Sequence, residues 1–181
     1  MNERQRKLKE QISKLQAELM EESRKEFGIQ SEALFASLPE ITAFQWTQYT
    51  PYFNDGYTCT FWVNTDSRSV TFQNGMRVNL EEIYVSESKW WDPVTRKSIP
   101  RTVIEIQKQI DNLTIEDENS GNQVTLEQLG ITYERAKQIR VAISQFLGSF
   151  TDDFMESTFG DHVIVTLNSD WSTDDDHYEH D

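Results

Sequence analysis

The first 26 residues show the apolar spacing of a helix that pairs with another helix. They contain no Pro or Gly and are rich in strong helix formers. Successive apolar positions are separated by four, three and four residues, which is the a/d pattern of a coiled-coil seam: Leu8, Ile12, Leu15 and Leu19. A helix with so narrow a stripe gains little stability alone. We therefore predict that it either pairs with a second copy of itself, giving a homo-oligomer, or lies on the rest of the chain.

Gly28 is predicted to end this first helix, because glycine is common just after a helix. Ser31 is then placed to cap a short second helix over residues 32–38, which Pro39 closes. The pattern thus predicts two consecutive helices, and it sets the first one, residues 1–27, apart from the main domain.

Two β-type runs around a turn form the most aromatic stretch of the chain, residues 45–64. Residues 41–49 predict a strand, and residues 51–56, which are rich in Pro, Asn, Asp and Gly, predict a tight turn. Residues 57–64 alternate in polarity and predict the return strand of an antiparallel hairpin. Its buried face is expected to carry Tyr57, Cys59, Phe61 and Val63.

The middle of the chain gives weaker patterns. Residues 65–75 and 116–123 are polar and predict loops, while residues 76–85 predict a third strand. Ser98 and Pro100 are typical of a helix start, and the following apolar positions keep helical spacing: Val103, Ile106, Ile110 and Leu113. A strand over residues 102–106 is the alternative.

Threonines mark three helix starts in the last third. Thr125 with Gln128 predicts a capping box for a short helix that stops at Gly130. Thr132 is expected to cap a longer helix, residues 133–147, with a core stripe of Ala136, Ile139, Ile143 and Phe146. Thr151 is expected to cap another short helix that carries Phe154 and Met155 and ends at Gly160, before a final strand over residues 162–167.

This order of elements predicts an α+β protein. It combines a small antiparallel sheet, made of the hairpin and two further strands, with helices on one face and a protruding N-terminal helix. Residues 28–171 are expected to form a single domain, and residues 172–181 an extended acidic tail.

Composition narrows the classes of function. The net charge is −14, and no Lys or Arg follows Arg140. An acidic C-terminal third repels phosphate backbones, so we expect a partner protein with a basic surface rather than nucleic acid. No run of 18 apolar residues predicts a membrane span, no secretory signal is recognisable, and the single Cys59 fits a reducing compartment.

Two groups of residues resemble catalytic or metal-ligating sets. The tail holds Asp174, Asp175 and Asp176 with His177 and His180, side chains of the type that bind divalent cations. With Asp161 and His162, such a tail suggests a metal-assisted hydrolase or nuclease as the alternative to a binding protein. However, a chain end rarely fixes its ligands, so we interpret the tail as a solvated acidic segment and expect no metal or cofactor.

Cys59 is a candidate nucleophile only if a histidine base reaches it. His162 is the candidate base, because both residues are expected on strands of one sheet. Cys59 shares its predicted face with Phe61 and Val63, so we interpret it as a core residue.

Aromatic and polar side chains gather at the predicted hairpin turn. Loops held by rigid strands are common binding positions, so the turn is a candidate partner-binding surface. Two adjacent tryptophans further along the chain are expected to cover the sheet edge or to form a second contact surface. The candidate binding residues are Trp46, Tyr49, Tyr52, Phe53, Asn54, Asp55, Trp90 and Trp91.

Two segments resemble a known family. The segment Trp46-Thr-Gln-Tyr-Thr-Pro-Tyr-Phe-Asn-Asp-Gly56, followed by Cys59 and Phe61, resembles the signature of a family of small uncharacterised proteins found mainly in bacteriophages. The C-terminal Phe159-Gly-Asp-His-Val-Ile-Val-Thr166 and Tyr178-Glu-His-Asp181 are similar to that family's last strand and closing acidic motif. The family usually continues from Asn-Asp-Gly with Asp-Pro-Cys, where this chain has Tyr57-Thr58-Cys59. The resemblance implies a phage origin and carries no activity.

These observations lead us to expect a non-enzymatic phage accessory protein that acts by protein–protein binding, of a host-interaction or anti-defence type. It would act in the host cell cytoplasm or in the virion, where a structural component is a further alternative.

Overall fold

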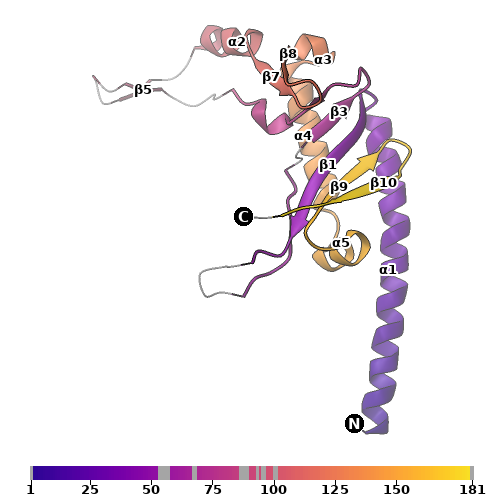
Figure 1. The fold of residues 1–181 in the computed structure, drawn as a ribbon. Helices are drawn as coiled ribbons and strands as arrows, with labels where there is room; N and C mark the ends of the chain where they lie inside the picture. Colours follow the sequence, from indigo (N-terminus) through magenta and orange to yellow (C-terminus); the bar gives the residue numbers. More distant parts are fainter. Residues whose placement is uncertain are drawn as a thin grey trace.

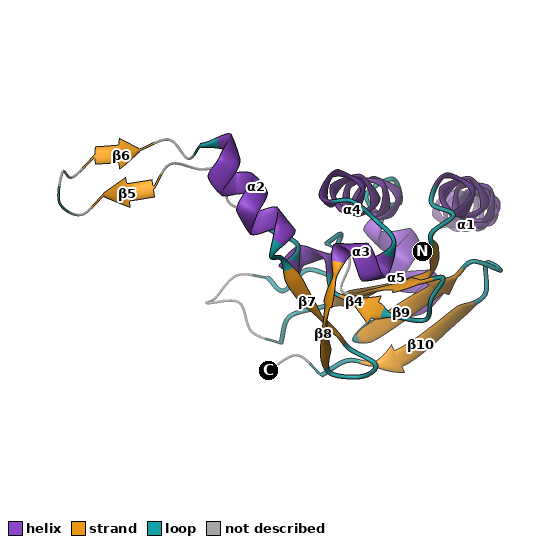
Figure 2. Cartoon of the chain, turned by 90° about the horizontal axis from the view of Figure 1, so that it is seen from above, coloured by secondary structure: helices purple, strands orange, loops and turns teal. Residues whose placement is uncertain are grey.

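The computed structural model describes residues 2–52, 58–66, 69–85, 94 and 102–179, and the backbone alone at 90–92 and 97–99. The chain is an α+β protein, as predicted. In the described residues, a six-stranded antiparallel sheet has the order β10-β9-β1-β3-β4, with β2 also paired to β1. Figure 2 shows helices α1, α4 and α5 over one face of this sheet.

The strands of the sheet come from both ends of the chain. β1 (Ile41–Tyr49) is the central strand, and β9 (Val163–Asn168) runs antiparallel along one side of it. On the other side lie β2 (Trp62–Val63) and β3 (Ser69–Phe72), and β4 (Arg77–Val78) pairs with β3. β10 (Thr173–His177) forms the edge beside β9, so the acidic tail is extended as expected and also joins the sheet.

α1 (Glu3–Ser37) is one continuous helix, so the predicted break at Gly28 is wrong. Ser31 does not cap a second helix, because its hydroxyl donates to the Phe27 carbonyl oxygen (2.7 Å) within α1. A Gly in a helix costs about 1 kcal/mol relative to Ala. Burial of Phe27, Leu34 and Phe35 in the core more than offsets that loss. The helix ends at Ser37, and its C-cap Leu38 lies directly before Pro39, the residue expected to close it.

The first half of α1 extends away from the rest of the protein (Figure 1). Every residue from 2 to 19 is exposed, and the first contact with the core comes from Met20. The exposed part of the helix, Glu3–Leu19, is about 26 Å long at 1.5 Å per residue. The N-terminal helix therefore protrudes as predicted, although the expected boundary at residue 27 falls inside it.

The central strand β1 has the predicted bounds and contributes to the core from most of its length. Phe44 and Trp46 are fully buried, as is Ile41. Residues that alternate along a regular strand would place Ile41 on the face opposite Phe44 and Trp46. A bulge between Ile41 and Ala43 inserts one extra residue and shifts the register, so Ile41 joins Phe44 and Trp46 in the core.

The middle of the chain departs from the predictions in several places. The return strand is limited to β2, since residues 58–61 form no strand and residue 57 lies outside the described part. β3 occupies part of the predicted loop over residues 65–75, and the predicted strand over 76–85 is replaced by β4 and the 3-10 helix η1 (Leu80–Glu82). Asn79 causes that change, because its side chain accepts from the Glu81 N–H (3.0 Å) and caps η1.

The predicted polar loop over residues 116–123 is a hairpin of β7 (Thr114–Asp117) and β8 (Asn122–Thr125). Gly121 supplies the left-handed conformation of its turn, with φ of 70°. A further hairpin, β5 (Trp90–Asp92) with β6 (Lys97–Ile99), lies away from the main sheet (Figure 1).

The helices of the last third match the predictions closely. α2 (Val103–Asp111) is a helix, so the alternative of a strand over residues 102–106 is wrong. Its N-cap is Thr102, and Val103 is exposed and not part of the core. The predicted caps Thr125, Thr132 and Thr151 precede α3 (Leu126–Leu129), α4 (Tyr133–Leu147) and α5 (Asp152–Phe159). The predicted core stripe of α4 is buried, as are Phe154 and Met155 of α5.

Candidate partner-binding surfaces

Side chains from three distant segments meet where β1 ends, and we call this group the aromatic end: Tyr49, Tyr52, Trp62, His162 and Tyr178. The Tyr49 ring centroid lies 5.8 Å from that of Trp62 and 5.5 Å from that of Tyr178. The Tyr52 ring stacks on His162 at 4.6 Å with 15° between the planes. Tyr52 is 69% exposed and Trp62 50% exposed, so the aromatic end offers ring surface to a partner.

Asp161 fixes the backbone around the aromatic end. Its Oδ1 accepts hydrogen bonds from the backbone N–H groups of Thr50 (2.7 Å) and His162 (2.8 Å). His162 adopts φ of 56°, and its carbonyl oxygen accepts from the Tyr178 N–H (2.7 Å). The Asp161 carboxylate thus joins the end of β1 to the start of β9, and the His162 carbonyl joins the start of β9 to the residue that follows β10.

The same contacts set the charge of Asp161. Burial alone raises the pKa of its carboxyl, but hydrogen bonds from the Thr50 side chain and from the backbone of Thr50 and His162 outweigh it. The pKa therefore lies below its usual value, and Asp161 is an anion at neutral pH. Its charge, next to aromatic faces, suits a cationic group of a partner.

Gln48 supports the aromatic end from the core side of β1. Its Oε1 accepts from Trp46 Nε1 (3.1 Å), and its Nε2 donates to the carbonyl oxygens of Met155 (3.1 Å) and Gly160 (2.5 Å). The side chain is completely buried. Gln48 therefore joins β1 to α5 and to the turn that leads into Asp161.

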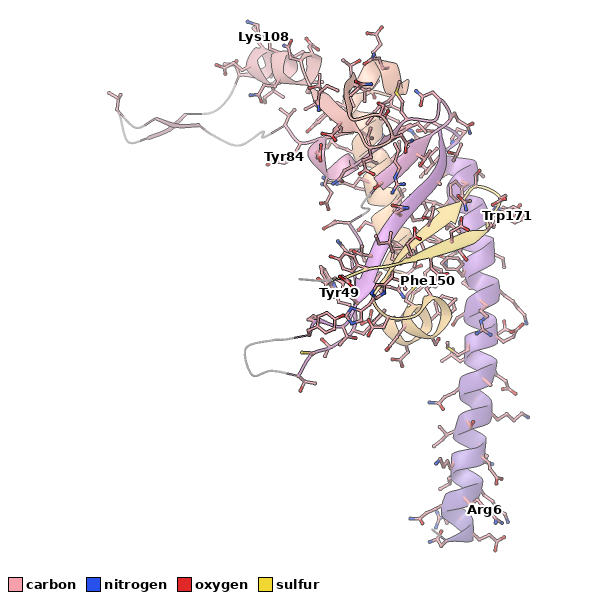
Figure 3. All side chains as sticks on the ribbon, viewed as in Figure 1. Arg6, Tyr49, Tyr84, Lys108, Phe150 and Trp171 are labelled. Atoms are coloured by element: carbon pink, nitrogen blue, oxygen red, sulfur yellow. The ribbon has the colours of Figure 1, made fainter. Side chains whose placement is uncertain are left out.

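The structure separates the predicted binding residues. Tyr49 and Tyr52 belong to the aromatic end, and Figure 3 shows Tyr49 at the end of β1. Trp46 is fully buried, with its ring packed against Phe44 and Phe159, so it is a core residue and cannot contact a partner of the folded protein. Phe53, Asn54 and Asp55 lie outside the described residues. The backbones of Trp90 and Trp91 lie in β5, and their side chains lie outside the described part.

Cys59 is half-buried and free, and it does not belong to the core cluster in which we had placed it. Phe61, two residues on, packs against that core, and Val63 is buried. The predicted inward face of the return strand is therefore correct near β2, where the strand forms.

The acidic tail spreads its charged side chains along β10. Asp174 pairs with Thr166, Asp175 with Val165 and Asp176 with Ile164, so neighbouring carboxylates point to opposite faces of the sheet. His177 Nε2 lies 3.9 Å from Glu179 Oε1, and both side chains are exposed. His180 lies outside the described residues. Within the part of the chain that the structure describes, no three His, Cys, Asp or Glu side chains converge to hold a metal ion.

The second candidate surface is the apolar seam of α1, formed by Leu8, Ile12, Leu15 and Leu19. These side chains are between 49% and 66% exposed. Each residue turns a helix by about 100°, which places the seam about a quarter turn from the strip that faces the core, Met20, Phe27 and Leu34. The seam therefore faces sideways, on a part of the helix that extends beyond the body of its own chain. The alternative in which this helix lies on the domain therefore holds for residues 20–27, where Met20 and Phe27 contact the core, and not for residues 2–19.

Two polar contacts that the sequence analysis missed join distant segments. On the sheet face away from the helices, Arg77 Nε lies 3.0 Å from Glu118 Oε2, and Glu118 also accepts from the Ser69 hydroxyl. The Gln48 network also went unpredicted, although a polar residue on the strand face that carries Phe44 and Trp46 is a signal of a buried hydrogen-bond network. No comparable signal pairs Arg77 with Glu118.

Among the described residues, no helix is both long enough and apolar enough to cross a membrane. Comparisons with models of protein families, with curated proteins and with solved structures gave no match.

Proposed function

We propose that this chain is a non-enzymatic binding protein. It self-associates through the seam of α1 and holds a partner protein with a basic surface at the aromatic end. The observation that carries the proposal is the exposed first half of α1, whose apolar side chains have no partner within the chain among the described residues.

Self-association explains why this part of the helix exists as a helix. Isolated helices shorter than about 12–15 residues are marginal in water, and longer ones depend on packing of an apolar face. The segment Glu3–Leu19 packs none of its residues against the core. Pairing of two seams buries four apolar side chains from each copy, which is the packing that the segment lacks.

The aromatic end and the chain's charge suit a basic partner. Tyr52, stacked on the residue that follows the anionic Asp161, and Trp62 offer exposed rings, and Arg or Lys side chains bind such groups through cation–π and ion-pair contacts. The nearby strand β10 adds three exposed aspartates. Electrostatic attraction of this kind speeds association with a cationic surface.

The resemblance to the phage family supports a setting for this function. The described parts of the two segments that carry it, residues 46–52 and 159–166 with Tyr178, lie together around Gln48 and Asp161 in the folded chain. We therefore place the protein in phage infection, where its partner is a host or virion protein.

The test is a seam variant, Ile12→Gln with Leu15→Gln. Full burial of a Leu or Ile side chain is worth about 1.5–3 kcal/mol, and 55% of Ile12 and 64% of Leu15 are exposed and thus open to burial by a partner, so each contributes about 1 kcal/mol. A dimer contains four such side chains, so the variant weakens self-association by about 4 kcal/mol, or about a thousandfold in Kd.

The matched control is Ser13→Gln with Ala17→Gln, which introduces the same side chain off the seam. We expect the control to self-associate like the wild type and the seam variant to sediment as a monomer. Affinity capture from infected cells with both variants then tests the partner. Equal self-association of all three proteins, or capture of no basic protein by the wild type, contradicts the proposal.

A further inference from the structure

We infer that two copies pair with their α1 helices antiparallel, and that the first turn of each helix seats in an acidic groove on the other copy. This inference rests on the proposed self-association and specifies its geometry. The groove lies between α1 and the corner that joins α4 to α5, and it is lined by Glu22, Ser23, Glu26, Ser149, Phe150 and Thr151.

Only two in-register arrangements bury all four seam residues of both copies. A parallel pair places each seam residue opposite its own equivalent. An antiparallel pair places Leu8 opposite Leu19 and Ile12 opposite Leu15, because the four positions are spaced symmetrically. The seam alone does not choose between them, so the residues that flank it decide.

The positions that continue the seam toward the body disfavour the parallel pair. After Leu19, the same spacing of three and four residues reaches Glu22 and Glu26. A parallel pair would set Glu22 against Glu22 and Glu26 against Glu26 of the partner at positions that face the helix interface. Like charges at such positions are destabilising, and Arg4 and Lys9 at the flanks would add a second repulsion.

The antiparallel pair brings opposite charges together. Residues 2–9 hold four basic side chains and one acidic one: Arg4, Arg6, Lys7 and Lys9 with Glu3. Residues 18–26 hold four acidic side chains and two basic ones: Glu18, Glu21, Glu22 and Glu26 with Arg24 and Lys25. These two segments face each other when the helices run in opposite directions.

The helix dipole acts in the same direction. The N-terminus of an α-helix carries a partial positive charge that anions stabilise. The first turn of α1 is ordered by a capping box, in which the Asn2 side chain accepts from the Gln5 N–H (2.8 Å) and the Gln5 side chain accepts from the Asn2 N–H (3.0 Å). In the antiparallel pair this turn lies beside Glu22 and Glu26 of the other copy.

The groove fits an arginine-rich first turn. Glu22 accepts from Lys25 Nζ (2.9 Å) and Glu26 from Gln30 Nε2 (2.8 Å), which leaves each carboxylate with further acceptor capacity. Phe150 forms the opposite wall and contacts Phe27 below it (5.1 Å). Figure 3 shows Phe150 beside α1 and Arg6 near the far tip of the helix, which is the part that reaches the groove of the partner.

Disulfide trapping tests the geometry in the full-length chain with Cys59→Ser. Two variants are made, Ile12→Cys and Leu15→Cys, and each is oxidised alone and in an equal mixture. In the antiparallel pair only Cys at 12 of one copy and 15 of the other come within disulfide reach, so about half of the mixed sample cross-links and each variant alone does not. Efficient cross-linking of either variant alone overturns the inference in favour of a parallel pair.

Charge reversal provides a second test that addresses the groove. Arg4→Glu with Arg6→Glu is expected to raise the dimer Kd by about tenfold, and adding Glu22→Arg with Glu26→Arg is expected to restore it. Fraying does not explain the first effect, because acidic residues stabilise a helix N-terminus. An unchanged or lower Kd for the first variant contradicts the groove. A wild-type chain that sediments as a monomer refutes the proposed self-association itself.

Discussion

Replacement of Gln48 by Leu tests whether the aromatic end depends on the buried network below it. Leu has nearly the same volume but cannot accept from Trp46 Nε1 or donate to the carbonyl oxygens of Met155 and Gly160. Each buried polar group left without a partner costs about 1–3 kcal/mol. The Met155 carbonyl keeps its hydrogen-bond partner within α5, so most of the cost comes from the unpaired Trp46 Nε1 and Gly160 carbonyl. We expect a loss of about 3 kcal/mol in the free energy of unfolding.

The assay is urea denaturation at one fixed protein concentration, because self-association makes apparent stability depend on concentration. Gln123→Leu is the matched control, since Gln123 is exposed on β8 and surface substitutions usually change stability by less than about 0.5 kcal/mol. In thermal unfolding, a loss of about 3 kcal/mol lowers Tm by about 6–12 °C. If both variants unfold at the same urea concentration, the Gln48 network does not stabilise the fold and our reasoning about this end of the sheet is wrong.

Three further predictions concern acid stability, one backbone position and partner binding. The hydrogen bond from Arg135 holds the pKa of the Glu40 carboxyl below its usual value, and the pKa of the Asp161 carboxyl is also lowered. Both carboxylates therefore stabilise the fold above their unfolded-state pKa values, and this stability is lost as the pH falls through their folded-state pKa values. Arg135→Met should remove the Glu40 part of this loss in acid titrations, and an unchanged profile contradicts it. Gly160→Ala should cost about 1–3 kcal/mol in denaturation, because Gly160 has φ of 92° and ψ of −179°; wild-type stability would show that the turn tolerates a side chain. Trp62→Ala should weaken binding of an arginine-rich peptide by about tenfold in calorimetry, whereas Tyr84→Ala, at a ring that is more exposed, should not; equal effects would place binding elsewhere.

Local signals predicted the parts of the fold that depend on neighbouring residues. Thr132 and Thr151 were placed correctly because a cap satisfies N–H groups two or three residues further on. The bounds of β1 also followed from its composition. By contrast, β3 pairs with β1, which is distant in the sequence, so local periodicity gave no sign of it. β7 and β8 pair with each other across a short turn, but their residues are mostly polar and therefore predicted a loop.

The candidate surfaces divide in the same way. The seam of α1 was visible as helical spacing, and the structure adds its direction relative to the core. The aromatic end was visible only through Tyr49 and Tyr52, because Trp62, His162 and Tyr178 join it through pairing of β1 with β2 and β9 and of β9 with β10. Trp46 was misjudged because alternation along a strand does not reveal which face the helices cover, and here they cover the face that carries Trp46.

The most direct test of the account is the mass of the full-length protein in sedimentation equilibrium over a range of concentrations. The seam of α1 predicts a species of twice the 21.2 kDa chain mass that dissociates as the protein is diluted. The same experiment with Ile12→Gln and Leu15→Gln should give the monomer mass at every concentration. A wild-type chain that stays at 21.2 kDa up to about 100 μM, where a dimer with Kd of 1 μM would be almost fully formed, contradicts the account.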